Sequence, residues 1–362
     1  MFDKIAKQNI LNVGAYVPGK PIEDVKREYG LERVIKLASN ENPIGVSPKA
    51  VEAMKKYIEN LNLYPDGYAY KLREKLSKKL EVNMENLIFG DGTDEVIEML
   101  FLAFVNIGDE VIYGWPSFVE YKRYAGIAGA VSKEIDLTDD YKFDLDEISK
   151  SVTEKTKMIF ICNPNNPTGT IVKKEDVEKF IKTVRKDVLI IFDEAYFEYA
   201  KDDKNYPNSL DYQKMGYRNV ITLRTFSKAY GMAGIRIGYG VADKEIIDIL
   251  ERVRLPFNVS VIAQAGAEGA IDDDKHIDDS IRINEAGKKY LYKEFERLGI
   301  KFVKTYSNFI YFEMKNAKKI FEEMMKKGVI VRQMGNNNIR VSIGLPDENE
   351  QFIKILEGVM KK

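Results

Sequence analysis

The chain has 362 residues, of which 56 are basic, 57 acidic and 44% hydrophobic, and its formal net charge is −1. This length favours two domains, and the balanced charge argues against a nucleic-acid surface, which normally carries a basic excess. Because no apolar run could cross a bilayer and no charged-then-apolar leader begins the chain, we expect a cytoplasmic protein without a membrane partner.

The chain holds one cysteine, Cys162, and one histidine, His276. A single cysteine cannot form an internal disulfide and fits a reducing compartment. One residue of each type predicts no metal site and argues against a Ser-His-Asp triad. The acidic run that precedes His276 favours a surface position for this histidine.

Three helical patterns come first along the chain. Ser47 and Pro48 begin an amphipathic stretch that runs to about residue 59, with serine as the N-cap and proline at the first helical position. A second pattern covers residues 70–80. Thr93 is predicted to cap a third, apolar-faced helix that runs to residue 105.

Short runs rich in β-forming residues follow, separated by turns and by helical patterns such as residues 174–186. Nearly continuous apolar runs are typical of strands buried on both faces, and intervening helices indicate parallel crossovers. The predicted strands are residues 110–113, 157–162, 188–193, 219–223 and 236–241.

The pattern changes near residue 259, where long helices and a hairpin of residues 328–333 and 338–343 are predicted. We therefore expect an α/β fold with a large domain, residues 45–258, around a mostly parallel central sheet. Residues 1–44 and 259–362 are expected to form a smaller α+β domain.

Two candidate site motifs follow predicted strands. Asp193 ends the run at 188–193, and ligands of open α/β sheets bind at such strand ends, although a strand-ending aspartate also caps turns. Thr225, Ser227 and Lys228 precede Arg236; hydroxyls with an arginine suit a phosphate, and a lysine there could form an imine with an aldehyde. A surface lysine on a glycine-rich loop is the alternative.

Two further motifs are weaker alone. The segment from Gly90 to Glu95 opens a helix, whose N-terminus can bind an anion, although a simple capped helix is the alternative. The turn at residues 163–169 could present the Asn166 amide, or be a plain loop. Together the four motifs supply an amine, an anion cradle, an amide and a carboxylate, which are the groups that pyridoxal 5'-phosphate (PLP) requires.

With these motifs the chain resembles the fold-type I aminotransferases along essentially its whole length. Among the members of that family, it looks most like the histidinol-phosphate aminotransferases. Further matching segments are residues 39–43, 64–65, 331–332 and 339–341. The resemblance implies PLP as cofactor, with Lys228 as its Schiff-base lysine and proton shuttle and Asp193 as the partner of the pyridine nitrogen. Asn166 and Tyr196 would bond the phenolic oxygen.

The same resemblance implies the remaining contacts. Phe118 would stack on the ring, where many relatives have tyrosine, and Tyr64 would reach the cofactor phosphate of a second subunit in a homodimer. The phosphate would be held by Gly92, Thr93, Asp94, Thr225, Ser227 and Arg236.

Substrate recognition is expected from Arg340, which matches the arginine that grips the α-carboxylate as a fork. Tyr16, Asn42 and Arg332 would line the same pocket. For the two arginines a surface ion pair on the hairpin is the alternative.

The implied reaction is amino transfer from L-histidinol phosphate to 2-oxoglutarate, giving glutamate, in histidine biosynthesis. Three alternatives stay open: a threonine-phosphate decarboxylase on the same fold, an aromatic or broad-specificity aminotransferase, and a PLP-sensing regulator. The regulator would need a DNA-binding extension, for which the sequence has no helix-turn-helix pattern.

Overall fold

The computed structural model describes residues 1–15 and 19–361, and its larger part is built on a seven-stranded sheet. The strand order is β2-β8-β7-β6-β5-β3-β4, and only β8 runs antiparallel to its neighbours. The strands are β2 Leu87–Gly90, β3 Glu110–Trp115, β4 Val131–Asp136, β5 Thr156–Cys162, β6 Leu189–Asp193, β7 Val220–Thr225 and β8 Gly238–Val241.

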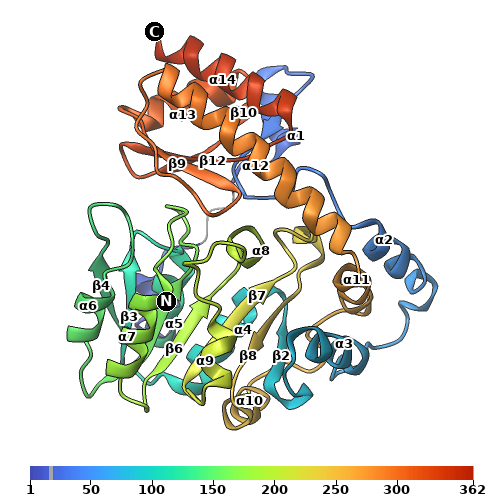
Figure 1. Ribbon diagram of the computed structural model, residues 1–362, viewed down its shortest axis with the longest axis vertical. Coiled ribbons are helices and arrows are strands. Elements are labelled where there is room, and N and C mark those ends of the chain that lie inside the picture. Colours follow the sequence, from blue (N-terminus) through green and yellow to red (C-terminus); the bar gives the residue numbers. More distant parts are fainter. Residues whose placement is uncertain (16–18, 362) are drawn as a thin grey trace.

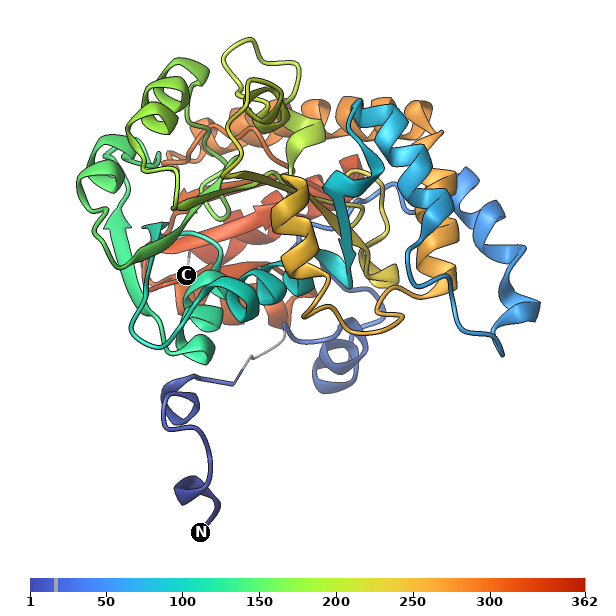
Figure 2. The ribbon, with the colours of Figure 1, turned by 90° about the horizontal axis from the view of Figure 1, so that it is seen from below.

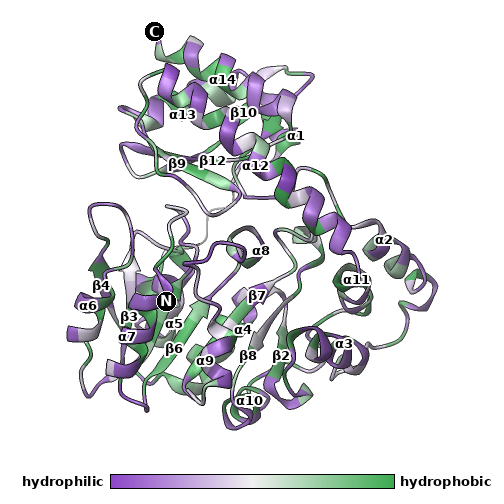
Figure 3. Cartoon of the chain, viewed as in Figure 1, coloured by the Kyte–Doolittle hydropathy of each residue, from purple (hydrophilic) through white to green (hydrophobic). Residues whose placement is uncertain are grey.

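Helices cover both faces of this sheet, which explains why its central strands are apolar throughout. Figure 1 shows α7 and α9 in front of the sheet and α4 behind it, and Figure 3 shows the apolar character of the strands between them. The helices of this part are α4 Gly92–Phe104, α5 Val119–Ala128, α6 Leu145–Lys150, α7 Lys174–Thr183, α8 Phe197–Ala200, α9 Ser209–Lys214 and α10 Lys244–Leu250.

The smaller part lies above the sheet in Figure 1 and has its own core, which includes Phe295, Phe312 and Phe352. Its three-stranded antiparallel sheet has the order β11-β12-β9, and β1 pairs in parallel with β10. The elements are α1 Ile22–Tyr29, β1 Ile35–Lys36, β9 Phe309–Glu313, α13 Ala317–Lys326, β10 Val329–Ile330, β11 Arg332–Met334, β12 Asn338–Ser342 and α14 Pro346–Met360.

The long helix α12, Asp274–Arg297, joins the two parts. The preceding helix α11, Val261–Ile271, packs on α2, Pro48–Lys55, and α3, Tyr70–Leu80, in a core cluster that includes Leu72 and Ala263. That cluster continues past residue 258, and the domain boundary placed there stays a prediction.

The first residues of the chain form an arm that extends from the body (Figure 2). The arm contains the 3₁₀ helices Phe2–Lys4 and Ile10–Asn12. The Asn9 side-chain amide ties it to the end of α5 by donating to the Gly126 and Ile127 carbonyls at 2.9 and 2.7 Å. Further 3₁₀ turns are Ile58–Asn60, Met84–Asn86 and Ala233–Ile235. Within residues 1–15 and 19–361, no helix is long and apolar enough to span a bilayer.

The expected fold class is confirmed, but several local predictions were wrong. The α4 helix begins at Gly92 with Asp91 as its N-cap, so Thr93 lies inside it. The α2 helix ends at Lys55, and β8 is not a parallel crossover strand. In the predicted hairpin, Val329–Ile330 pairs with β1, which leaves Arg332–Met334 as the partner of β12.

His276 was also expected at the surface, yet it is only 7% exposed. It lies in the first turn of α12, whose N-cap is Asp273. The adjacent Ile277 packs in a cluster with residues of both parts of the chain, among them Tyr196 and Phe309. Burial lowers the pKa of the histidine. The acidic run therefore marks a helix N-terminus, where acids are favourable, and does not mark an exposed loop.

Candidate active site

The site lies at the carboxyl ends of three neighbouring parallel strands. Cys162 ends β5, Asp193 ends β6 and Thr225 ends β7, and Cys162 and Asp193 stand opposite each other in register. The loops that follow these strands carry Asn166, Tyr196 and Lys228. Parallel pairing thus gathers residues that are far apart in sequence at one edge of the sheet, where open α/β sheets bind ligands.

Lys228 lies three residues beyond β7, and its side chain is half-buried. Its Nζ atom is 3.5 Å from the Ser39 carbonyl oxygen and 5.8 Å from the centre of the Tyr196 ring. Burial, followed by the positive charge of Arg340, lowers its pKa from 10.5 to about 8. The neutral fraction near neutral pH is therefore larger than for an ordinary lysine, and only the neutral amine can attack an aldehyde.

Asp193 is 3% exposed, and its carboxylate accepts two hydrogen bonds. Tyr121 Oη donates to Oδ2 at 2.6 Å, and the Ala195 backbone N–H donates to Oδ1 at 3.2 Å. Burial raises its pKa from 3.8 to about 6, against the lowering effect of both donors. A carboxylate has about four acceptor positions, so it retains capacity for a further N–H donor such as a protonated ring nitrogen.

Tyr196 and Asn166 approach the same space from two loops. The Tyr196 hydroxyl accepts a hydrogen bond from Asn40 Nδ2 at 2.8 Å, and its pKa is raised, first of all by burial. Asn166 Oδ1 accepts a hydrogen bond from Nη1 of Arg340. A phenol and an amide so placed could donate to an oxygen between them.

The anion cradle combines α4 with the loop after β7. The Arg236 Nη1 atom is 3.4 Å from Ser227 Oγ, and Thr225 Oγ1 is 3.0 Å from the same oxygen. Arg236 adopts a left-handed backbone with φ of 59°, which a non-glycine residue holds only when its surroundings enforce it. The N-cap of α4 makes no side-chain hydrogen bond, so first-turn N–H groups remain for an anion.

Two acidic residues at the start of α4, the N-cap Asp91 and the first-turn Asp94, form ion pairs with Arg236. Asp94 Oδ2 lies 3.4 Å from its Nη2 atom, and Asp91 Oδ1 lies 3.6 Å from its Nε atom. A methyl group on Gly92, whose φ is 73°, would collide with the guanidinium. The absence of a side chain at this position therefore leaves room for Arg236 against the start of α4.

Of the two hairpin arginines, Arg340 reaches Asn166 from the smaller part of the chain. Arg332 and Arg340 stand directly opposite each other in β11 and β12, so their side chains share one face. Arg340 is 8% exposed, and its Nη2 atom donates to the Ala38 carbonyl at 2.7 Å. The alternative that Arg340 forms a surface ion pair is wrong, because Arg340 is buried and its hydrogen bond to Asn166 joins the two parts of the chain.

The remaining predicted residues differ in how close they lie to this cluster. Asn42 Nδ2 donates to the Ala229 carbonyl and to Ser280 Oγ, both at 2.8 Å, so it braces the backbone next to Lys228. Phe118, the N-cap of α5, is half-buried, with its ring edge-on to Tyr121. Tyr64 is 82% exposed and stacks on Phe257 at 4.7 Å. Tyr16 lies outside the described residues.

Sequence reasoning assigned no role to Tyr121 or Asn40, although each bonds a predicted catalytic residue. Helical spacing could have indicated Tyr121, because a residue three positions after Phe118 lies one turn further along the same face of α5. Asn40 belongs to a matched segment, but its hydrogen bond spans 156 positions, and no local pattern indicates it.

The residues present fit PLP. Lys228 offers an amine to the aldehyde, Asp193 a buried acceptor to the ring nitrogen, and Arg236 with α4 a cradle for the phosphate. Near neutral pH this acceptor is largely ionised and the amine partly neutral.

Comparison with known proteins agrees with this geometry. The sequence model of the family "Aminotransferase class I and II" matches residues 32–356. The chain is 46% identical to a histidinol-phosphate aminotransferase of Moorella thermoacetica, over 98% of this chain and 92% of that protein. It is 44% identical to a histidinol-phosphate aminotransferase of Caldicellulosiruptor saccharolyticus, over 98% of this chain and 99% of that protein.

Among solved structures, the histidinol-phosphate aminotransferase of Sinorhizobium meliloti in complex with pyridoxal-5'-phosphate has the same fold. Its TM-score is 0.89 at 23% identity, and the match covers 98% of this chain and 97% of that one. The family match, the identity to the two relatives and the PLP-compatible site agree. The chain therefore belongs to the class I and II aminotransferases, a family that acts with PLP.

Proposed function

We propose that this protein transfers the amino group between L-histidinol phosphate and 2-oxoglutarate, as a step of histidine biosynthesis. The observation that carries amino transfer is the convergence of the half-buried Lys228 with the buried Asp193 and Arg340. The choice of substrate is supported by relatives of that name at 46% and 44% identity over nearly the whole chain.

Bound PLP would supply an aldehyde for the amine and an electron-withdrawing ring that stabilises negative charge at the substrate's Cα. Lys228 would first hold the cofactor through its Nζ atom and, once displaced by the substrate amine, take the Cα proton. Its lowered pKa suits this second role, because a general base works best when its pKa is near the operating pH. Asp193, ionised at neutral pH, would hold the proton of the ring nitrogen.

Substrate anions would be recognised by the two arginines. Arg340 can offer two parallel N–H donors to a carboxylate, after exchanging its hydrogen bond with Asn166. Arg332, on the same face of the hairpin, is half-buried and could meet a second anionic group. One pocket with two cations suits both partners of the reaction, because each substrate in turn carries an anion.

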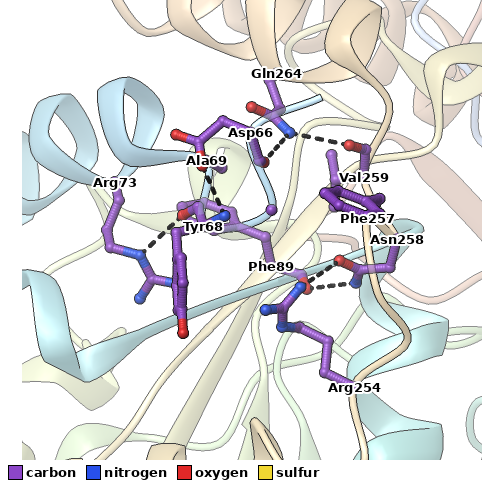
Figure 4. Close-up of a pocket in the computed structure, with 11 residues that line it drawn as sticks. Asp66, Tyr68, Ala69, Arg73, Phe89, Arg254, Phe257, Asn258, Val259 and Gln264 are labelled. Carbon is purple, nitrogen blue, oxygen red and sulfur yellow. Dashed lines mark hydrogen bonds between the residues drawn. The ribbon is translucent and has the colours of Figure 1, made fainter. Parts of the chain in front are cut away.

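We also propose a cytoplasmic homodimer in which Tyr64 of one copy completes the site of the other. Tyr64 and its stacking partner Phe257 are 82% and 45% exposed, and Leu61, Leu63 and Leu255 beside them are more than half exposed. Apolar surface gathered in this way is typical of an interface. Figure 4 shows how hydrogen bonds of Asn258 and Gln264 fix the two loops that carry this surface.

A half-reaction on the PLP-loaded protein tests the proposal. Histidinol phosphate, glutamate, phenylalanine and threonine phosphate are added separately, without an oxo-acid acceptor, and the visible absorbance of the bound cofactor is followed. We expect histidinol phosphate and glutamate each to convert it stoichiometrically to the pyridoxamine form. Carbon dioxide release from threonine phosphate alone would instead identify a decarboxylase, and a response to phenylalanine as strong as that to histidinol phosphate would indicate broad specificity.

A further inference from the structure

Tyr121 makes the shortest side-chain hydrogen bond to Asp193 among the described residues, at 2.6 Å between Oη and Oδ2. The tyrosine is fully buried on α5, and three rings surround it. It stacks on Phe160 at 4.5 Å, packs at a tilt against Tyr113 at 6.0 Å, and meets Phe118 edge-on at 5.6 Å. Because this packing fixes the ring, the hydroxyl is held at the carboxylate.

The surroundings of Asp193 act on its ionisation in both directions. Burial favours the neutral acid, and the charge of Asp94 acts in the same direction, while Lys228 opposes it. Cys162, opposite Asp193 in register, is a buried thiol whose pKa is raised, so it contributes no negative charge at neutral pH. Tyr121 has the largest effect in favour of the ionised carboxylate.

Tyr121 itself stays a donor. Burial, followed by the negative charge of Asp193, raises its pKa well above the ordinary value of a phenol. Its proton therefore remains on Oη across the working range of pH. A hydrogen bond donated to a carboxylate lowers the basicity of that carboxylate.

We propose that Tyr121 is a positioning residue that keeps Asp193 ionised and thereby keeps the proton on the ring nitrogen of PLP. The inference rests on the proposed function only for its use of PLP. One proton is shared between the ring nitrogen and Asp193. With Tyr121 in place the proton stays on nitrogen, and without it the more basic carboxylate takes the proton. The ring then withdraws electrons less strongly.

The test is the ¹⁵N chemical shift of the ring nitrogen in protein loaded with ¹⁵N-labelled PLP, measured without substrate. Free labelled PLP at low and high pH gives the two reference shifts. In Tyr121→Phe we expect the ratio of protonated to unprotonated nitrogen to fall by about ten- to a hundredfold, because a hydrogen bond to a charged group is lost. A ratio equal to that of the unaltered protein would overturn the inference.

Tyr212→Phe is the matched control. Tyr212 is 2% exposed, packs on Phe192 next to Asp193, and its hydroxyl has no hydrogen-bond partner among the described residues. Its loss should leave the ¹⁵N shift unchanged. If the ratio of protonated to unprotonated nitrogen fell as far in Tyr212→Phe as in Tyr121→Phe, the effect of Tyr121 would come from packing and not from its hydrogen bond.

Two further measurements complete the test. If Tyr121→Phe fails to fold, para-aminophenylalanine at position 121 keeps the ring and donates a weaker hydrogen bond, and an unchanged ratio there overturns the inference. In the half-reaction, Tyr121→Phe should lower the maximal rate constant of cofactor conversion, while the half-saturating concentration of the amino donor stays within about twofold. Because the ¹⁵N shift needs no substrate, an unreactive histidinol phosphate would refute the proposed substrate and leave the role of Tyr121 standing.

Discussion

Replacing Arg340 by glutamine removes a positive charge that acts on Lys228. The charge of Arg340 is the second-largest cause, after burial, of the lowered pKa of the lysine. A positive neighbour disfavours the ammonium form, so its removal must raise the pKa. The neutral, reactive amine then forms at higher pH in Arg340→Gln than in the unaltered protein.

The size of this change follows from the structure. The pKa of Lys228 falls from 10.5 to about 8, with burial as the largest cause and the charge of Arg340 as the second. Arg236 also lowers the pKa, while Asp94 and Glu41 raise it. We therefore expect the substitution to raise it by about one unit, equal to about 1.4 kcal/mol.

The assay is the rate at which apoprotein attaches PLP, measured by visible absorbance between about pH 6 and pH 10. The rate should rise with the neutral fraction of Lys228, with a midpoint near pH 8 in the unaltered protein and about one unit higher in Arg340→Gln. Arg340→Lys keeps the charge and is the control, so its midpoint should stay near that of the unaltered protein. A midpoint in Arg340→Gln that stays in place or moves to lower pH would refute the reasoning.

Three further predictions address the rest of the site. Lys228→Ala should abolish turnover while circular dichroism and the melting temperature stay close to those of the unaltered apoprotein; normal transamination would remove the central assignment. Gly92→Ala should weaken PLP binding, measured by fluorescence titration, by about tenfold or more, because the new methyl group collides with Arg236 at a positive φ. Asp193→Asn should gain stability relative to the unaltered apoprotein, by up to about 3 kcal/mol, as the pH rises from 4 to 8. The sign follows from the raised pKa of Asp193, about 6, because the stability that this carboxyl gives the unaltered protein is lost as the pH rises through that value. Urea unfolding of both proteins at pH 4 and pH 8 measures the difference in stability, and a difference that is the same at both pH values would contradict the prediction.

The central strands could be predicted because burial on both faces leaves a direct mark on composition. Residues 157–162 and 188–193 are apolar nearly throughout, and the structure places β5 and β6 there. The edge strand β4 was missed because four of its six residues, Ser132, Lys133, Glu134 and Asp136, are polar or charged, so it has no continuous apolar run. The direction of β8 and the pairing of β10 with β1 depend on which strand lies alongside, and no local pattern carries that information.

The site was predictable where a motif follows a strand. Asp193, Lys228 and Arg236 lie in such motifs, and the structure brings them to one edge of the sheet, although their catalytic roles stay predictions. Hydrogen bonds between distant segments were not predictable. The bond between Tyr121 and Asp193 spans 72 positions, and only the packing of α5 against the sheet brings them together.

The helix α12 is one continuous connection between the two parts of the chain. With 24 residues it is about 36 Å long. Near its start, Ser280 Oγ donates to the Ala229 carbonyl, next to Lys228, while Leu291 and Phe295 near its far end belong to the core of the smaller part. A pivot of about 5° at the anchored end would displace the far end by roughly 3 Å. Such a displacement would change the distance between the arginines of the β11–β12 hairpin and Lys228, so the fit of α12 at both of its ends sets the spacing of the amine and the substrate cations.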